Sequence, residues 1–389
     1  MPSKESDSTR KKRSAKKRSL LPLFIFLILL LILSSGVLIY LIRNHANASK
    51  GADTVTHLSV QTGFACEFSE AQKLYPFSNG VLKVTATRVA YLSMAGDEIY
   101  GVDIQMDNPF CVIRGSHALV ADSGGYFCAL FDDKGLICNK QLTGAISFGA
   151  LSSDGMAGLI IEQPQTKGSV YLLDNKGNFL AQWNSVESGY PISISFSPDQ
   201  KDVNIALVDT DGSAMQPHLK QIELPSADNG QITKEMALYS PETSAILPSI
   251  SYLGDERVVL AGISDVLLCS KGTTQMLSNP FTQVDSIFPV GKGSIVIYTD
   301  GVGQEIRMEY LGIDFTRGKS IVLGNTFTDA DALGDKVVVS ADDKILVIRA
   351  SDLTVLKTIS VDEEVIRIGI VNEGTIIVVT VSGVHELSI

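Results

Sequence analysis

The chain has 389 residues, 45% of them hydrophobic, and a formal net charge of −11. Its first nineteen residues hold eight basic and two acidic side chains, a net charge of +6, which leaves −17 for the rest. Anionic membrane surfaces and nucleic acid repel such an acidic main part, so we expect no nucleic-acid partner.

Residues 1–19 form a basic tail that is expected to stay in the cytoplasm, because positively charged flanks are retained there. Residues 20–42, LLPLFIFLILLLILSSGVLIYLI, contain no charged side chain. At about 1.5 Å rise per residue, a helix of this length can cross the roughly 30 Å hydrocarbon core of a bilayer. The sequence therefore predicts a single-pass cell-membrane protein, anchored by residues 20–42, whose C-terminal part is extracytoplasmic.

Two other interpretations of this segment stay open. A cleaved signal peptide would use the small residues Ala46-Asn47-Ala48 as its cleavage site, although the apolar run exceeds the roughly 7 to 15 residues of an ordinary signal-peptide core. A buried helix of a soluble domain is the second alternative. Residues 43–56 are small and polar, which is typical of a juxtamembrane linker.

From residue 57 to 389, short β-branched segments alternate with Gly, Asp, Asn and Ser turns. One segment recurs about every 40 residues, which predicts an all-β propeller with three or four strands per unit. Its copies are VLKVTAT (81–87), HALVAD (117–122), AGLIIE (157–162), NIALVD (204–209), RVVLAG (257–262), SIVIYT (294–299), KVVVSA (336–341) and TIIVVT (375–380). They favour eight blades; seven is the alternative, because the long interval around 210–257 could hold an irregular insertion.

Two hairpins support this interpretation. Residues 126–139 and 170–183 each place an Asp-x-Lys-Gly turn between two strands. Asp accepts local N–H groups at the start of such a turn, and Gly supplies a positive φ at its end.

The last unit ends at Ile389 after about three strands, so we expect the N-terminal side to supply a fourth. His57–Gln61 is the predicted donor, and closing the ring in this way removes unpaired strand edges.

Short turn motifs resemble those of known propellers. LSSDG (151–155) and FSPDQ (196–200) resemble the Phe-Ser-Pro-Asp-Gly turn of WD40-like and quinoprotein-like propellers, although Trp-Asp pairs do not recur and Trp183 is the single tryptophan. The layout of basic tail, one span and degenerate propeller also resembles an uncharacterised family of single-pass membrane proteins from Firmicutes. That resemblance supplies no catalytic residues.

The five cysteines are scattered and form no Cys-x-x-Cys motif or Cys/His cluster, so no metal or haem site is predicted. Cys128 and Cys138 flank a predicted hairpin turn. They either form a disulfide or remain buried thiols, depending on the strand register.

No catalytic, cofactor-binding or metal-binding residue can be assigned from motifs. Asp209-Thr210-Asp211-Gly212 resembles the start of a calcium loop, but its twelfth position is Lys220 rather than Glu, so a turn is predicted. The histidines are isolated in sequence: His45, His57, His117, His218 and His385. Three acidic pairs are also predicted to be solvated turns: Asp132/Asp133, Asp342/Asp343 and Glu363/Glu364.

We therefore expect a non-catalytic, membrane-tethered binding scaffold without a cofactor, whose partner is an envelope protein or ligand. The alternative is an extracytoplasmic enzyme with its site at the central channel. Titratable groups that converge at the axis with perturbed pKa values would indicate the enzyme. An exposed apolar or aromatic patch on a face would indicate the scaffold.

Overall fold

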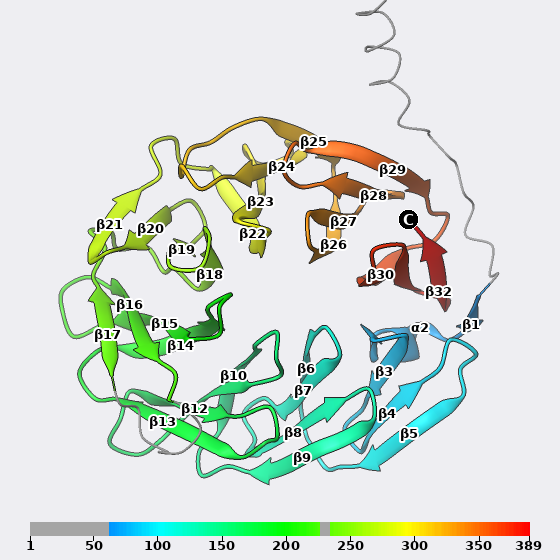
Figure 1. The fold of residues 1–389 in the computed structure, drawn as a ribbon, viewed down its shortest axis with the longest axis horizontal. Coiled ribbons are helices and arrows are strands. Elements are labelled where there is room, and N and C mark those ends of the chain that lie inside the picture. The colour runs from blue at the N-terminus through cyan, green and yellow to red at the C-terminus, as the bar shows by residue number, and fades with distance from the viewer. Residues whose placement is uncertain (1–61, 226–233) are drawn as a thin grey trace, which may run out of the picture. The chain divides into compact units, whose positions relative to one another are not determined.

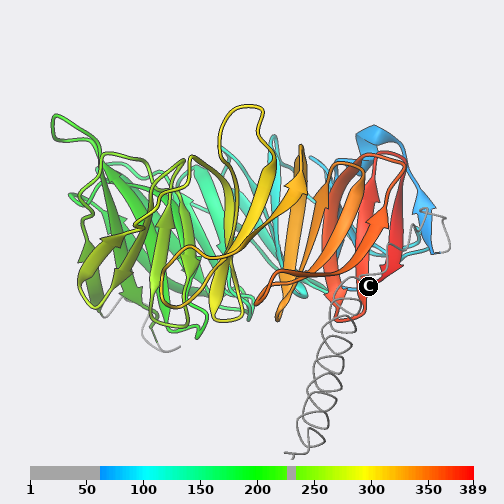
Figure 2. The same ribbon diagram turned by 90° about the horizontal axis from the view of Figure 1, so that it is seen from above.

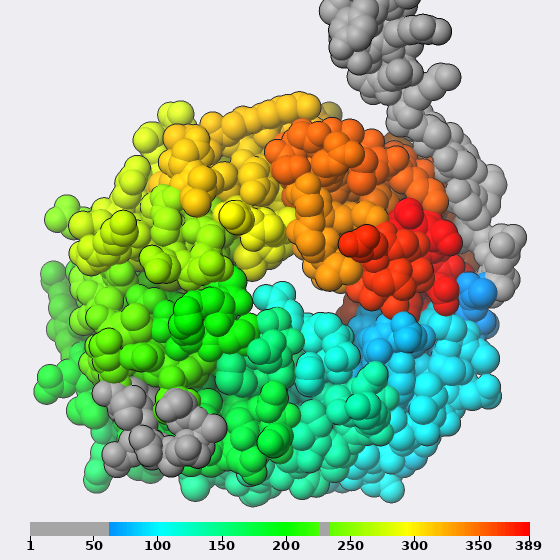
Figure 3. Space-filling view, viewed as in Figure 1, coloured from blue at the N-terminus to red at the C-terminus, as the bar shows by residue number. Residues whose placement is uncertain are grey.

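The computed structural model describes residues 62–225 and 234–389, which form eight four-stranded antiparallel sheets. The sheets are arranged around a central axis (Figure 1), and the space-filling view shows an opening at the centre (Figure 3). This arrangement confirms the predicted all-β propeller with eight blades.

Each sheet is built from consecutive strands, counted here from the axis outward. The first sheet contains β2 (Leu74–Phe77), β3 (Gly80–Val84), β4 (Arg88–Leu92) and β5 (Glu98–Asp103). The second contains β6 (Pro109–Arg114), β7 (His117–Asp122), β8 (Phe127–Asp132) and β9 (Gly135–Gln141). The third contains β10 (Ile146–Leu151), β11 (Ala157–Ile161), β12 (Gly168–Leu173) and β13 (Phe179–Ser185). The fourth contains β14 (Tyr190–Phe196), β15 (Asp202–Asp209), β16 (Gln216–Glu223) and β17 (Glu235–Tyr239).

The remaining sheets follow the same plan until the last one. The fifth contains β18 (Ser249–Tyr252), β19 (Val258–Ala261), β20 (Val266–Ser270) and β21 (Thr273–Met276). The sixth contains β22 (Gln283–Val290), β23 (Gly293–Thr299), β24 (Ile306–Leu311) and β25 (Ser320–Gly324). The seventh contains β26 (Phe327–Leu333), β27 (Lys336–Ala341), β28 (Lys344–Arg349) and β29 (Thr354–Ser360). The eighth contains β30 (Val365–Asn372), β31 (Thr375–Thr380), β32 (Gly383–Ser388) and, from the other end of the chain, β1 (Gly63–Ala65).

The eight recurring segments of the sequence all coincide with the second strand of a sheet. These strands are nearly continuous Val, Ile, Leu and Ala, because neighbouring sheets cover both of their faces. The described residues hold eight hydrophobic clusters, one between each pair of neighbouring sheets. The core is therefore divided among eight interfaces between neighbouring sheets, each of which we call a seam.

The eighth sheet joins the two ends of the described chain. β1 pairs antiparallel with β32, with Gly63 opposite His385 and Ala65 opposite Gly383. Gly63 has a φ of 146°, and a Cβ there would lie 1.9 Å from the Val384 carbonyl oxygen, so only glycine fits. The closing strand is thus residues 63–65, whereas the predicted donor, His57–Gln61, lies outside the described residues.

Two faces of the ring can be distinguished. Strands alternate in direction, so the connections from second to third strand lie on the same face as the connections between sheets. We call this the top face, and the opposite one the bottom face; α2 (Phe68–Ala71) links β1 to β2 on the top face. In Figure 2 the top face is uppermost.

The predicted hairpin turns are confirmed. The Asp132 carboxylate accepts N–H groups of Lys134 and Gly135 at 2.9 and 3.0 Å. Asp174 accepts the N–H of Lys176 at 2.9 Å, and Gly177 has a φ of 76°.

Within residues 62–225 and 234–389, no helix is long and apolar enough to cross a bilayer. The predicted span, residues 20–42, lies outside these ranges, as do the basic tail and the linker.

The pairing of β1 with β32 predicts a specific loss on truncation. A chain that starts at residue 66 should unfold at a lower temperature than one that starts at residue 62, because it lacks the outer strand of the eighth sheet. A few hydrogen bonds at about 1 kcal/mol each lower the midpoint by roughly 5 °C or more. Circular dichroism melting measures this difference, and equal midpoints would contradict closure by β1.

Candidate functional site

The innermost strands carry an unusual group of charged residues next to the axis. Asp329 and Asp331 lie on β26, and each carboxylate accepts a backbone N–H from β30: Ile368 at 2.9 Å and Ile370 at 2.7 Å. Innermost strands have one unpaired edge, so these carboxylates satisfy N–H groups that the sheet leaves free. The two acids therefore join the seventh sheet to the eighth.

Burial raises the pKa of both acids. The pKa of Asp329 rises to about 6, because the loss of water around the carboxylate outweighs its hydrogen bonds and the nearby charge of Arg367. Burial also raises the pKa of Asp331, with Arg114 as the opposing charge. Raised carboxyl pKa values near a channel are one property of enzyme sites, so this pair is the feature that favours the enzyme alternative.

Arg367 makes the corresponding connection from the eighth sheet to the first. Its guanidinium donates to the carbonyl oxygens of Gln72 and Leu74 at 3.0 and 3.2 Å. It also lies 4.1 Å from the centre of the Tyr75 ring.

Asp329 and Arg367 share their structural position with Ser193, which also connects two neighbouring sheets. Ser193, Asp329 and Arg367 each follow a β-bulge near the start of an innermost strand. Ser193 donates from its hydroxyl to the carbonyl oxygen of Pro248, which lies in the neighbouring sheet's approach to β18. A bulge re-aims the side chain that follows it, and here it directs a polar group across the seam. This shared geometry indicates a structural role for Asp329.

The described histidines lie in different sheets. His117 begins β7, His218 lies on β16 with its Nδ1 2.9 Å from the Ser240 hydroxyl, and His385 is buried on β32. Burial lowers the pKa of His218 and His385. His45 and His57 lie outside the described residues. No group of three or more metal-binding side chains occurs in the part of the chain that the structure describes.

The paired acids and the calcium-like segment occupy turns. Asp342 accepts the N–H groups of Asn325 and Thr326, both at 2.9 Å, and Glu363 accepts the hydroxyl of Ser382 at 2.6 Å. Asp209 accepts the N–H of Asp211 at 3.0 Å, as expected for a turn.

All five cysteines are free thiols. Cys128 on β8 lies opposite Lys140 rather than Cys138, which pairs with Leu130 two positions away. Burial raises the pKa of Cys128 to about 12, so its thiol is a small apolar group of the core. Of the two alternatives, the free thiols are the one observed.

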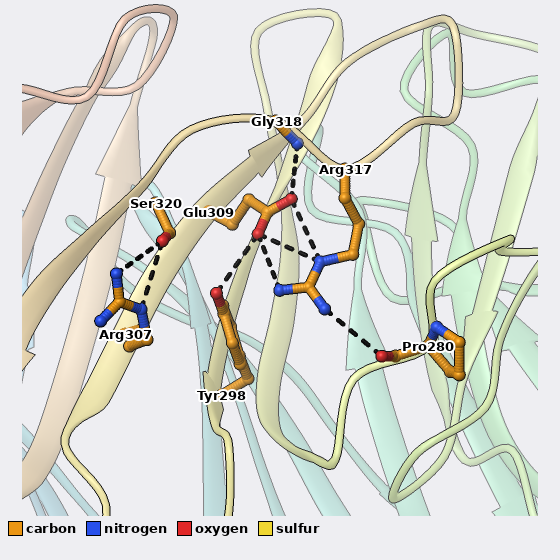
Figure 4. Close-up of polar contacts among 7 residues, drawn as sticks. All are labelled: Pro280, Tyr298, Arg307, Glu309, Arg317, Gly318 and Ser320. Carbon is orange, nitrogen blue, oxygen red and sulfur yellow. Dashed lines mark hydrogen bonds and ion pairs between the residues drawn. The ribbon is translucent and has the colours of Figure 1, made fainter.

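A buried ion pair holds the sixth sheet (Figure 4). Glu309 on β24 is 1% exposed, and Arg317 from the β24–β25 connection donates to its Oε2 at 3.1 Å. The Gly318 N–H donates to Oε1 at 2.7 Å and the Tyr298 hydroxyl to Oε2 at 3.3 Å. The guanidinium also lies 4.0 Å from the centre of the Phe281 ring. Glu309 is fully enclosed by protein donors, so this cluster fixes the β24–β25 connection.

A cleft of about 620 Å³ opens on the top face where the second, third and fourth sheets meet. The connections 143–145 and 162–168 of the third sheet form its floor and wall. Tyr126 lies on one side and Tyr190 on the other, each 48% exposed. The volume lies in the range of small-ligand and short-peptide sites, and exposed tyrosines are frequent in binding surfaces.

Hydrogen bonds hold the wall of this cleft in place. Gln163 donates from Nε2 to the Thr143 hydroxyl at 2.9 Å and accepts from Gln182 at Oε1 at 3.0 Å. The Thr166 hydroxyl donates to the Gln163 carbonyl oxygen at 3.0 Å. Gln165 adopts a left-handed φ of 64°, a strained conformation that such a bonded loop can maintain.

The cleft lining contains two charged residues, Glu162 and Lys167, and only Lys167 is ion-paired to another described residue. Lys167 forms ion pairs with Asp209 at 3.3 Å and Asp211 at 2.5 Å, across the seam between the third and fourth sheets. Its ammonium lies 5.9 Å from the Tyr190 ring centre. Hydrogen bonds with the two aspartates raise the pKa of Lys167. The cleft thus combines two aromatic rims with a preformed polar wall.

Sequence reasoning did not identify this cleft. Tyr126 and Tyr190 are 64 positions apart and belong to no motif, so only the ring brings them together.

The chain matches the model of a family of unknown function (DUF5711) over residues 52–388. No curated protein sequence matches it. Among solved structures, Sqt1 from Chaetomium thermophilum aligns with a TM-score of 0.50 and 13% identity, covering 81% of this chain and 90% of that one. BamB from Moraxella catarrhalis gives 0.49 and 11%, with 84% and 99% covered. The β-propeller domain of Swd1 from Myceliophteria thermophila gives 0.47 and 11%, with 74% and 98% covered. At such identities the likeness concerns the fold alone.

The buried ion pair predicts a strong asymmetry between variants. Arg317→Met leaves the Glu309 carboxylate buried without its partner, which should cost about 3–5 kcal/mol of unfolding free energy. The double variant Glu309→Leu/Arg317→Met should lose less than the single one, because it buries no charge. Urea unfolding measures both. Arg349→Met, which breaks an exposed pair with Asp352, is the control and should cost less than about 1 kcal/mol.

Asp329 predicts a pH dependence of stability. Its pKa is raised from 3.8 in the reference state to about 6 in the fold, so the folded state holds the proton more tightly. Its stabilising contribution is complete below about pH 4 and is lost as the pH rises through about 6. Between pH 5 and 7.5 the unfolding free energy of the parent protein should fall by about 1 kcal/mol more than that of the Asp329→Asn variant. Asp285→Asn, an exposed carboxyl on β22, should leave the loss unchanged; if both variants behave like the parent, the assignment is wrong.

Proposed function

The chain belongs to the family of unknown function DUF5711, and we propose that it is a membrane-tethered, extracytoplasmic β-propeller that binds a protein or ligand of the cell envelope. The observation that carries this proposal is the cleft on the top face, with Tyr126 and Tyr190 on its rims. Loops on a rigid scaffold are where propellers of any sequence can vary without loss of the fold, so they are suited to recognition.

The tether is supported by the sequence. Residues 20–42 form an uncharged run of sufficient length, and the basic tail before it favours a cytoplasmic N-terminus. The same layout resembles single-pass membrane proteins of Firmicutes. β1 begins at Gly63 on the bottom face, the face opposite the cleft.

The position of the charged groups at the axis also favours binding over catalysis. Asp329, Asp331 and Arg367 are engaged with the backbone of a neighbouring sheet. A general acid or base must instead reach a substrate proton. The enzyme alternative depends on the raised pKa of Asp329. It requires that Asp329→Asn change an activity while leaving the fold intact.

Two measurements on cells test the proposal. Protease added to intact, wall-stripped cells should digest the propeller and spare residues 1–19, because the domain is outside. Protection of the propeller would contradict the orientation, and release of a soluble form that starts near Ser49 would contradict the anchor.

Cross-linking in the same cells tests the cleft. The variant Tyr126→Ala/Tyr190→Ala should recover at least one envelope partner roughly tenfold less well, since truncated interface tyrosines commonly cost over 1 kcal/mol. Phe179→Ala removes an equally exposed aromatic ring on β13, outside the cleft, and serves as the control. Equal recovery with both variants would contradict the role of the cleft.

A further inference from the structure

A second feature of the top face lies on the fourth, fifth and sixth sheets. Each of these sheets connects its second and third strands by a projecting loop: residues 210–215, 262–265 and 300–305. Figure 2 shows the first of these loops, in green, and the last, in yellow-orange, extending above the top face.

Each loop exposes one aliphatic or thioether side chain. The exposed fraction is 46% for Met215, 74% for Ile263 and 102% for Val302. Ile246, in the link that leads to the fifth sheet, is 46% exposed and adjoins the second loop, since a Cβ on Gly262 would lie 2.4 Å from its carbonyl oxygen. A single exposed apolar residue needs no explanation, but the same kind of exposed side chain recurs on the top face of three consecutive sheets.

The other connections of this type differ in composition. None of these described connections has an exposed aliphatic or thioether side chain: Val381 is only partly exposed, and Tyr126 belongs to the cleft. Their sequences are TAT (85–87), SGGY (123–126), EQPQTK (162–167), DD (342–343) and VS (381–382). Among the described connections from second to third strand, exposed aliphatic or thioether side chains therefore occur only in one arc of the ring, the fourth, fifth and sixth sheets, whereas Phe68 and Val186 are exposed in links between other sheets.

Hydrogen bonds connect the segments of this arc into one surface. Gln216 donates from Nε2 to the Pro241 carbonyl oxygen at 3.0 Å. The Thr243 hydroxyl donates to Asp265 at 2.6 Å. The Ile263 carbonyl oxygen accepts the N–H of Val284 at 2.6 Å, which ties the fifth sheet to the sixth. The tips are thus presented by a connected scaffold rather than by independent loops.

The arc is acidic around its apolar tips. Its exposed acids are Glu242, Asp285, Asp300 and Glu305, together with Asp211, which is paired with Lys167. Residues 210–216, 240–248, 262–265, 283–285 and 300–306 contain no lysine or arginine. A partner that covers the tips must therefore approach through a field of one sign.

We propose that this arc docks a basic amphipathic segment of a partner protein. Its aliphatic side chains would cover Met215, Ile263 and Val302, and its lysines or arginines would face the surrounding acids. Charge complementarity selects this occupant: an anionic bilayer is repelled, and so is the same arc of a second copy. The inference rests on the proposed function only in that the chain is a binding module, since the arc shares no apolar tip with the cleft.

Labelled peptides and the purified full chain in zwitterionic nanodiscs test the proposal. The probe is a 14-residue helical peptide of leucine and lysine with an apolar face; matched leucine/glutamate and serine/lysine peptides are the controls. Fluorescence anisotropy should show saturable binding of the first peptide and at least tenfold weaker binding of both controls. Because exposed charges are screened, 500 mM salt should weaken binding about tenfold relative to 50 mM.

Variants locate the binding on the arc. Ile263→Ser/Val302→Ser should weaken the leucine/lysine peptide tenfold or more, and Asp300→Asn/Glu305→Gln should reduce the salt dependence. Ile99→Ser, which removes an equally apolar side chain that is 57% exposed on β5, should change neither. Equal binding by all variants, or equal binding of the leucine/glutamate peptide, would overturn the proposal.

Two further outcomes assign the arc to another occupant and also overturn it. Flotation with zwitterionic or anionic vesicles that depends on Val302 would indicate a lipid surface. A dimer in light scattering that Ile263→Ser/Val302→Ser abolishes would indicate a second copy. If the tyrosine variant loses its envelope partner while the arc variants bind every peptide equally, this inference fails and the proposed function stands. If the arc binds the leucine/lysine peptide as expected and no envelope partner is recovered, this inference stands and the proposed function fails.

Discussion

The structure depends on the need to cover both faces of every sheet. The second strands are apolar on both sides, so a sheet with only one neighbour would expose a hydrophobic face to water. An open row of such sheets would expose an apolar face at each end. A closed ring has no end sheets, so every sheet has a neighbour on both faces. The pairing of β1 with β32 joins the two ends of the described chain within one sheet, and Phe64 of β1 packs against the cluster between the eighth and first sheets.

This constraint separates the parts of the molecule that hold it together from those that can recognise a partner. The seams use the apolar faces and, near the axis, polar bridges such as Asp329 and Arg367. The ion pair of Glu309 and Arg317 likewise serves the scaffold. The top-face connections between strands contribute little to these stabilising contacts between sheets. Their sequences are therefore free to differ from sheet to sheet. The cleft and the apolar arc both lie there, on adjoining sectors of one face.

The fold could be predicted because its period is local. Each second strand, such as KVVVSA at 336–341, is a continuous apolar run followed by turn residues. Eight copies of this segment predict eight sheets. The closing strand could not be placed, since GFA at 63–65 is three residues long and its pairing partner lies over 300 positions away. The bridging acids were missed for a related reason. FTDADAL reads as a polar segment, and only the bulge before Asp329 shows that it points across a seam. Neither the cleft nor the apolar arc has a motif, because each assembles residues from three sheets.

The orientation of β1 has a mechanical consequence. This strand runs from the bottom face toward the top face and is held by hydrogen bonds that lie across its axis. Tension applied at Thr62 along the strand loads those bonds together, in shear, whereas a sideways pull would open them one after another. The resistance of the ring to such tension is governed by an unfolding rate rather than by equilibrium stability. The strand that would bear such tension is the same one that completes the eighth sheet.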